Sequence, residues 1–186
     1  MSKAPQPDAR ATRADLVAQL RRLQGEIQRV QARLMALGGD TLPGIHLVIE
    51  AAGRRALLPA GRVVEIVRMV ATTPLAGAPP NVIGTFICRG TPVLAYDLSR
   101  LLGSKEEPGL DSQIVVLAGT PTVGLVVDRV PRLVEDPRIY EGDVVAGLPE
   151  AWRDSRLASG LCMDGEEVLP VLDPSPIQAE LSGKDA

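Results

Sequence analysis

The chain has 186 residues, of which 45% are hydrophobic and 2% aromatic, and its formal net charge is −3. This length suits one globular domain with an appendage. Asp and Glu (23) outnumber Lys and Arg (20), which disfavours nucleic-acid binding because phosphates are held by basic surfaces. The scarcity of aromatic residues also argues against a platform for stacking bases or sugars. We therefore expect an aliphatic core of Val, Leu, Ile and Ala.

The sequence shows no sign of export or membrane insertion. Its N-terminal residues lack the apolar run of a secretory signal, and no stretch approaches the ~20 apolar residues of a membrane span. The two cysteines, Cys88 and Cys162, are far apart and have no partners at metal-ligand spacing, so we expect buried free thiols. These features predict a soluble cytoplasmic protein without direct membrane insertion.

Residues 1–40 are expected to form an N-terminal extension that carries an amphipathic helix over about residues 12–37. Thr12 can cap this helix, and Gly38-Gly39 can end it. Apolar residues recur at alternating spacings of four and three, which is the heptad repeat of a coiled coil. This seam consists of Leu16, Leu20, Leu23, Ile27, Val30, Leu34 and Leu37.

Two interpretations of the seam stay open. The helix can pack on the chain's own domain, or it can form a coiled coil with a second copy or with a partner helix. The narrow, strictly heptad pattern favours the coiled coil. Gly25 lies on the outward face, where it costs about 1 kcal/mol relative to Ala without breaking the seam. The flanking positions offer no clear charge pairing and hold Gln19, Gln24, Glu26, Gln31 and Arg33.

After residue 40, short apolar runs separated by glycine-containing turns replace the helical repeat. Many short strands with tight turns are typical of an all-β sandwich or barrel. We expect one domain over residues 41–180, a disordered tail at 181–186, a helical turn at Leu98–Leu102 and an irregular connection over Glu135–Arg156. The expected strands are Ile45–Ala51, Arg55–Pro59, Val63–Met69, Val82–Arg89, Thr91–Tyr96, Gln113–Ala118, Thr122–Asp128, Val130–Glu135, Ser159–Met163 and Glu167–Leu172.

Two segments of the domain resemble each other. Gly84–Asp97 and Gly160–Asp173 each contain a glycine, an apolar strand, a glycine turn, a second apolar strand and a final aspartate. This repeat predicts two hairpins that belong to two barrel-like halves of related design.

No catalytic, cofactor-binding or metal-binding set emerges from the sequence. The single histidine, His46, lies in an apolar predicted strand, where we expect a structural role because no partner that would activate it is evident. The sequence has no nucleophile elbow, phosphate loop or dinucleotide fingerprint. We therefore expect neither enzymatic activity nor a cofactor.

A series of motifs resembles a known family. Their order and spacing are similar to those of CheW-like chemotaxis coupling domains over roughly residues 43–178. The motifs are Arg62-Val63-Val64-Glu65-Ile66-Val67, then Pro79, Gly84-Thr85-Phe86-Ile87-Cys88-Arg89-Gly90, Val93, Asp97-Leu98, Val123–Val130 and the final Val168–Asp173.

The resemblance implies an all-β fold of two intertwined five-stranded β-barrels with a groove between them, here preceded by the N-terminal amphipathic helix. Members of the family bind the tip of a chemoreceptor's cytoplasmic helical hairpin and the regulatory domain of a histidine kinase. The implied function is a non-enzymatic adaptor in a chemotaxis-type array near the inner membrane. The alternative is a self-assembling scaffold that dimerises through the N-terminal helix, with partial loss of receptor or kinase binding.

The same resemblance assigns roles to individual residues. Glu65 and Arg89 fall where the family carries an acid on one strand and an arginine at the following hairpin, which implies an ion pair that braces the first barrel. Four further residues match positions that shape the partner groove, although ordinary packing and turn geometry would also explain them. These are Val63, Pro79, Gly84 and Val93.

The chain departs from the family pattern around this presumed partner surface. Ile87 and Cys88 replace an Asn and a Leu, Leu94 replaces a Pro, and Leu75-Ala76 replaces an Ile-Pro pair. We expect these changes to affect which receptor and which kinase the chain recognises.

Overall fold

The computed structural model describes residues 41–142, 148, 150–153 and 157–181, together with some positions between 15 and 30. The chain divides into two compact units, residues 1–39 and residues 40–186. In the part of the chain that is described, no helix has the length and apolar character needed to cross a membrane.

In the first unit, the described positions between 15 and 30 have helical backbone. Three of them, Leu16, Leu23 and Val30, have exposed side chains. The other four seam residues lie outside the described residues, so the helix over 12–37 and its coiled coil stay predictions. These four are Leu20, Ile27, Leu34 and Leu37.

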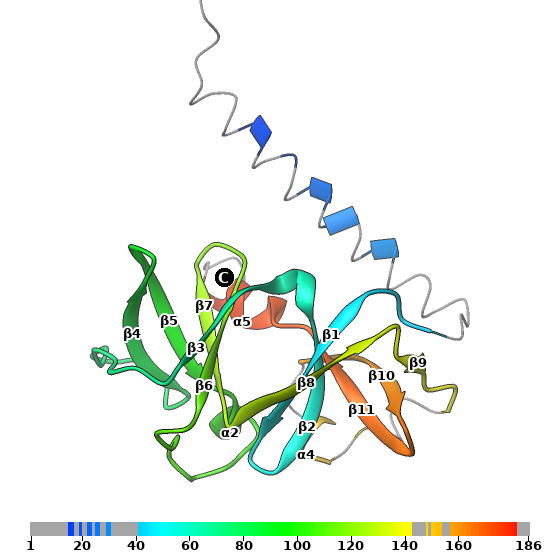
Figure 1. The fold of residues 1–186 in the computed structure, drawn as a ribbon. Helices are drawn as coiled ribbons and strands as arrows, with labels where there is room; N and C mark the ends of the chain where they lie inside the picture. The colour runs from blue at the N-terminus through cyan, green and yellow to red at the C-terminus, as the bar shows by residue number, and fades with distance from the viewer. Residues whose placement is uncertain are drawn as a thin grey trace, which may run out of the picture. The chain divides into compact units, whose positions relative to one another are not determined.

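The second unit contains two mixed β-sheets (Figure 1). The first sheet has the strand order β8-β1-β2-β11-β10-β9, in which β2 and β11 are parallel and the other neighbours are antiparallel. Its strands are β1 (Ile45–Ala51), β2 (Arg54–Pro59), β8 (Arg129–Glu135), β9 (Arg138–Ile139), β10 (Ala158–Asp164) and β11 (Glu167–Leu172).

The second sheet has the order β3-β6-β7-β5-β4, and here β5 and β7 are the parallel pair. Its strands are β3 (Val63–Arg68), β4 (Val82–Cys88), β5 (Thr91–Asp97), β6 (Gln113–Leu117) and β7 (Val123–Val127). The helical elements of this unit are η1 (Ala60–Arg62), α2 (Leu98–Leu101), α4 (Glu150–Arg153) and α5 (Ser175–Leu181).

All ten predicted strands are confirmed, each within one residue at either end, and so is the helical turn after Asp97. The second sheet has five strands and the first has six, because β9 adds to the edge of β10, and the arrangement as two intertwined five-stranded barrels stays a prediction. The connection Glu135–Arg156 was expected to be irregular but contains β9 and α4. Helix α5 was also not predicted. Except for Leu181, the expected tail lies outside the described residues.

The two sequence-related segments are related in structure as well. Each forms an antiparallel hairpin, β4–β5 or β10–β11, with a register shift at its glycine, Gly84 or Gly160. Each hairpin ends at an aspartate that accepts a backbone N–H near the start of a helix, Asp97 from Arg100 and Asp173 from Ser175. The predicted repeat of hairpins is therefore confirmed, one hairpin in each sheet.

The core is aliphatic, as predicted from composition, and the two unpredicted helices complete it. Trp152 of α4 and Ile177 of α5 are buried in the main cluster. On α5, Gln178 donates to the carbonyl of Ala118 at 3.0 Å and accepts a bond from Arg62 at 3.1 Å. Through Gln178, helix α5 thereby links η1, which precedes β3, to the residue that follows β6.

Gly84 is a position where the fold requires glycine. Its φ is +151°, and a Cβ there would lie 2.8 Å from the carbonyl carbon of Thr73. This close approach allows the Thr73–Thr85 bridge, in which the two residues exchange backbone hydrogen bonds of 2.7 and 2.9 Å. Any side chain at Gly84 would therefore push the loop before β4 away from that strand.

We expect Gly84→Ala to lower the free energy of unfolding by about 3 kcal/mol, because it combines backbone strain with overpacking. Urea denaturation measures the change. Gly61→Ala is the matched control, because a Cβ there meets nothing within 4 Å. Equal stability of the two variants would contradict this account of Gly84.

His46 lies buried near the start of β1, as its structural role predicts. Its Nδ1 is 3.0 Å from the carbonyl oxygen of Gly44, and its Nε2 has no hydrogen-bond partner among the described residues. Burial lowers the pKa of His46 below its ordinary value of 6.5, although Gly44 and Asp136 partly oppose this. The unfolded chain therefore binds a proton here more readily than the folded chain.

We expect the domain to lose stability as the pH falls below about 6.5, with a slope of at most about 1.4 kcal/mol per pH unit from this residue. Above that pH both states are neutral at His46, and its contribution is constant. Chemical denaturation at pH 7.5 and pH 5.5 measures the slope, with His46→Gln as the variant that lacks it. An unchanged slope in His46→Gln would contradict this account.

Candidate functional site

Strands β3 and β4 are the two edges of the second sheet, and they bound an open space. The loop that follows β3 is linked to β4 by the Thr73–Thr85 bridge. Residues two apart in a strand direct their backbone N–H and C=O groups to the same side. The peptide groups of Ile87 therefore point to the same open side as those of Thr85.

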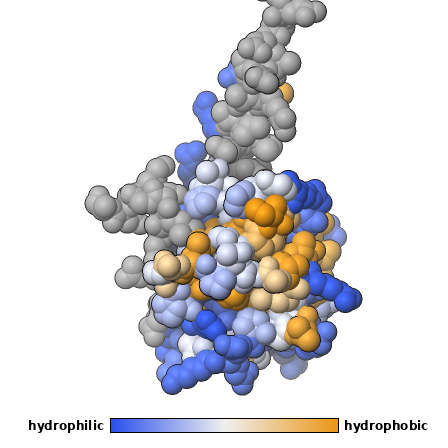
Figure 2. All heavy atoms as spheres, turned by 90° about the vertical axis from the view of Figure 1, so that its left-hand side faces the viewer, coloured by the Kyte–Doolittle hydropathy of each residue, from blue (hydrophilic) through white to orange (hydrophobic). Residues whose placement is uncertain are grey.

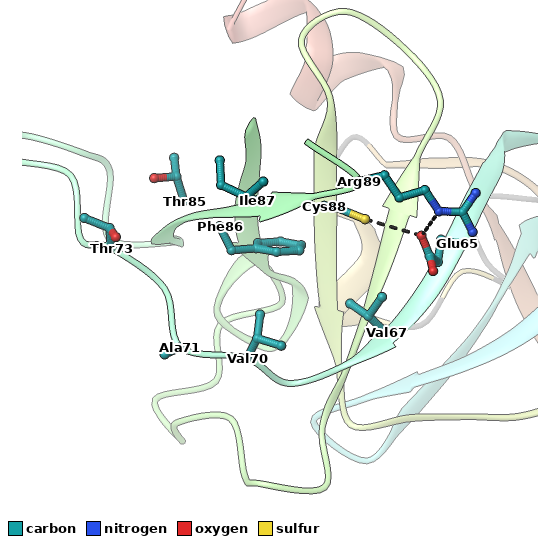
Figure 3. Close-up of a pocket in the computed structure, with 10 residues that line it drawn as sticks. All are labelled: Glu65, Val67, Val70, Ala71, Thr73, Thr85, Phe86, Ile87, Cys88 and Arg89. Atoms are coloured by element: carbon teal, nitrogen blue, oxygen red, sulfur yellow. Dashed lines mark hydrogen bonds and ion pairs between the residues drawn. The ribbon is translucent and has the colours of Figure 1, made fainter. Parts of the chain in front are cut away.

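The space between the two edges is a pocket of about 540 Å³. Phe86, Val67 and Val70 point into it, and Glu65, Cys88 and Arg89 close one end (Figure 3). The pocket thus combines an apolar floor with one charged wall.

The charged wall is built around one carboxylate oxygen. Oε2 of Glu65 accepts from Nε of Arg89 at 2.7 Å and from the thiol of Cys88 at 3.4 Å. The ion pair spans the gap between β3 and the end of β4. The side chain of Arg89 remains 72% exposed and that of Glu65 only 27%, so the guanidinium can also reach a bound partner.

The hairpin turn places Arg89 for this contact. Cys88 and Thr91 pair across the strands, so Arg89 and Gly90 form a two-residue loop. Both have positive φ, +49° and +78°, as a type I′ turn requires. The glycine at the second position suits this geometry. The turn places Arg89 beside the open side of β4, where it reaches Glu65 on β3.

The electrostatics of this wall follow from its hydrogen bonds. The bond from Arg89 holds the pKa of Glu65 below its ordinary value, and the bond from Cys88 adds to this. Burial raises the pKa of the Cys88 thiol, and its contact with Glu65 acts in the same direction. Cys88 therefore stays a protonated thiol that donates to a charged carboxylate.

Apolar side chains gather around the pocket. Figure 2 views the side of the domain that carries β4 and β5 and shows apolar residues clustered on it. Alternation along β3 places the exposed Val64 and Ile66 on the opposite side of the strand from Glu65 and Val67, which line the pocket. The exposed large apolar residues of β4 and of the loop from β3 to β4 are Val70, Leu75 and Ile87. We call these three residues and the pocket the β3–β4 face.

No metal site is found among the described residues. No three acidic, histidine or cysteine side chains there are placed to hold a metal ion. Both cysteines are free thiols, as predicted, but only Cys162 is fully buried, since Cys88 lies partly exposed at the pocket. The arrangement of the β3–β4 face suits contact with another macromolecule better than chemistry on a small molecule.

Comparison with known proteins places this geometry in a family. The CheW-like domain family matches residues 46–181. The chain belongs to the CheW-like domain family. The crystal structure of the scaffolding protein TtCheW from Thermoanaerobacter tengcongensis has the same fold, with a TM-score of 0.59 and 22% identity over 70% of this chain and 84% of that chain. None of the curated proteins matches this sequence.

The CheW-like domain brings together some of the residues singled out from sequence and not others. Glu65 and Arg89 form the predicted ion pair and line the pocket. Val63 is half-buried at the start of β3, and Pro79 is exposed in the loop before β4. Gly84 and Val93 are buried, so any effect of theirs on a partner would act through the packing of β4 and β5.

Sequence reasoning missed the role of Cys88, which bonds to Glu65, and the apolar floor of Val67, Val70 and Phe86. A signal for Cys88 was present, since it is one of the positions where the chain departs from the family pattern. The floor could not be read in advance, because it depends on β3 and β4 being the two edges of one sheet.

We expect Arg89→Ala to raise the pKa of Glu65, because the largest cause of its lowering is removed. Cys88→Ala should raise it less. NMR titration of the Glu65 side-chain carboxyl measures both shifts. The control is Arg68→Ala, which removes an exposed arginine from the same strand. A Glu65 pKa that does not change in Arg89→Ala would show that the ion pair is absent in solution.

Proposed function

We propose that this protein is a non-enzymatic adaptor that couples chemoreceptors to a histidine kinase in a chemotaxis-type signalling array. The observation that carries the proposal is the β3–β4 face, where an apolar pocket with an ion-paired wall lies between two sheet edges. Membership of the CheW-like domain family and the fold of a scaffolding protein support it. Cytoplasmic location at receptor arrays near the inner membrane follows from this role.

The β3–β4 face has the composition of a docking surface. Exposed apolar groups lie at its centre, and Arg89 is the kind of residue that contributes strongly to protein interfaces. A partner that covers the face would desolvate the apolar groups and strengthen the ion pair by excluding water. Binding would therefore depend on both parts of the face.

The regulatory domain of the histidine kinase is the partner we assign to the β3–β4 face. The open edge at Ile87 and the apolar pocket beside it suit a partner that presents its own apolar strands or loops. We assign the tip of the receptor's helical hairpin to a separate region, the groove that the family resemblance implies between the two halves of the domain.

We expect Ile87→Asp and Arg89→Ala each to weaken binding of the purified chain to the regulatory domain of its kinase by about tenfold or more. Isothermal titration calorimetry measures the dissociation constant. Ile87 is 67% exposed, so the aspartate can be solvated in the free protein and the fold should survive.

Leu110→Asp is the matched control, since Leu110 is 95% exposed in the loop before β6 and does not line the pocket. Circular dichroism and thermal unfolding check that all variants are folded. Full binding by both Ile87→Asp and Arg89→Ala would overturn the assignment of the kinase to the β3–β4 face.

A further inference from the structure

The heptad seam of the first unit has no role in the adaptor function described above. The family match begins at residue 46, so the seam lies outside the CheW-like domain. Three seam residues are described, and their side chains are exposed by 61% (Leu16), 47% (Leu23) and 55% (Val30). Each has helical backbone, and a spacing of seven residues puts them on one face of a continuous helix. Large apolar groups repeated along one helical face require a partner surface.

Two polar contacts are described on the remaining surface of this segment. Arg22 pairs with Glu26 one turn later at 3.3 Å, and Nε of Arg29 donates to the carbonyl of Gly25 at 3.2 Å. These contacts lie outside the seam, so the seam itself is left for intermolecular packing.

The repeat indicates what kind of surface covers the seam. Its period is 3.5 residues over three heptads, whereas a helix that lies on a globular domain follows a 3.6 period with a wider apolar arc. A period of 3.5 keeps the seam in register with another helix of the same repeat as the two supercoil. The partner surface is therefore another heptad helix.

We propose that the seam pairs with the same seam of a second copy of this chain, as a two-stranded coiled coil. Such a seam is complementary to itself, and its flanking positions hold one Glu, one Arg and three Gln, so no block of like charge opposes self-pairing. Polar flanks also make the seam narrow, which suits two strands. The positions equivalent to Leu16 hold Leu three times and Val30 once, and the alternate set holds Leu20, Ile27 and Leu34.

The consequence for signalling depends on the proposed adaptor function. A dimer carries two CheW-like domains, so one particle can engage two binding sites in an array. When two sites are within reach, the second binding event becomes intramolecular and the apparent affinity rises. The first unit would then join neighbouring signalling units rather than contact receptor or kinase itself.

The test is the mass of the full chain by sedimentation equilibrium over a range of concentrations. We expect a dimer of twice 19.7 kDa that dissociates on dilution. Leu23→Lys should weaken the dimer affinity at least a hundredfold, so that the chain becomes monomeric. Gly25→Lys places the same charge on the outward face and should leave the dimer intact.

Gly25→Ala provides a test in the opposite direction. A Cβ at this position meets nothing within 4 Å, and alanine favours the helix in both chains, so the dimer should tighten about tenfold. Thermal unfolding of the CheW-like domain should not change in any of these variants. A chain that is monomeric at all concentrations, or a dimer that Leu23→Lys leaves unchanged, overturns the proposal. Neither result bears on kinase binding through the β3–β4 face, which is measured separately.

Discussion

Each sheet of the domain is joined by one pairing between parallel strands, β2 with β11 and β5 with β7. A parallel pairing cannot be made by a tight turn, so each one brings a hairpin onto strands from elsewhere in the chain. The hairpin β10–β11 joins strands from the start of the domain, and β4–β5 joins β6–β7. The second sheet is formed by consecutive strands, β3 to β7, that lie between β2 and β8 in the chain, and the two strand orders correspond from β3 to β8, β6 to β1, β7 to β2, β5 to β11 and β4 to β10.

The position of the candidate site follows from this topology. With β5 against β7, strands β3 and β4 become the edges of one sheet, and a residue after β4 can reach across to β3. Glu65 and Arg89 make that contact. In the other sheet the corresponding strands carry an ion pair of reversed polarity, Arg132 on β8 with Asp164 on β10. The two halves therefore carry the same kind of ion pair between their edge strands, with the acidic and the basic residue exchanged. This difference allows them different partners.

Much of this fold was predictable because the strands are short, apolar and bounded by glycine turns. Elements that were missed lack these signals. Strand β9 has two residues, and α5 begins within a Pro-Ser-Pro stretch that suggests a break, although Asp173 and Pro176 are also suited to a helix start. The ion pair of Glu65 and Arg89 was expected from family resemblance and is present in the structure, while its role at a partner surface stays a prediction. The thiol of Cys88 as a second donor to Glu65 depends on a distance between two edge strands, which no local pattern encodes.

The central claim is that the β3–β4 face binds the regulatory domain of the kinase. Hydrogen–deuterium exchange of the full chain, alone and with that domain, tests it most directly, because unpaired edge strands exchange quickly unless a partner covers them. The account predicts slower exchange at Val63–Arg68 and Val82–Cys88 in the complex. Protection confined to β8 and β10, with no change at β3 and β4, would contradict it.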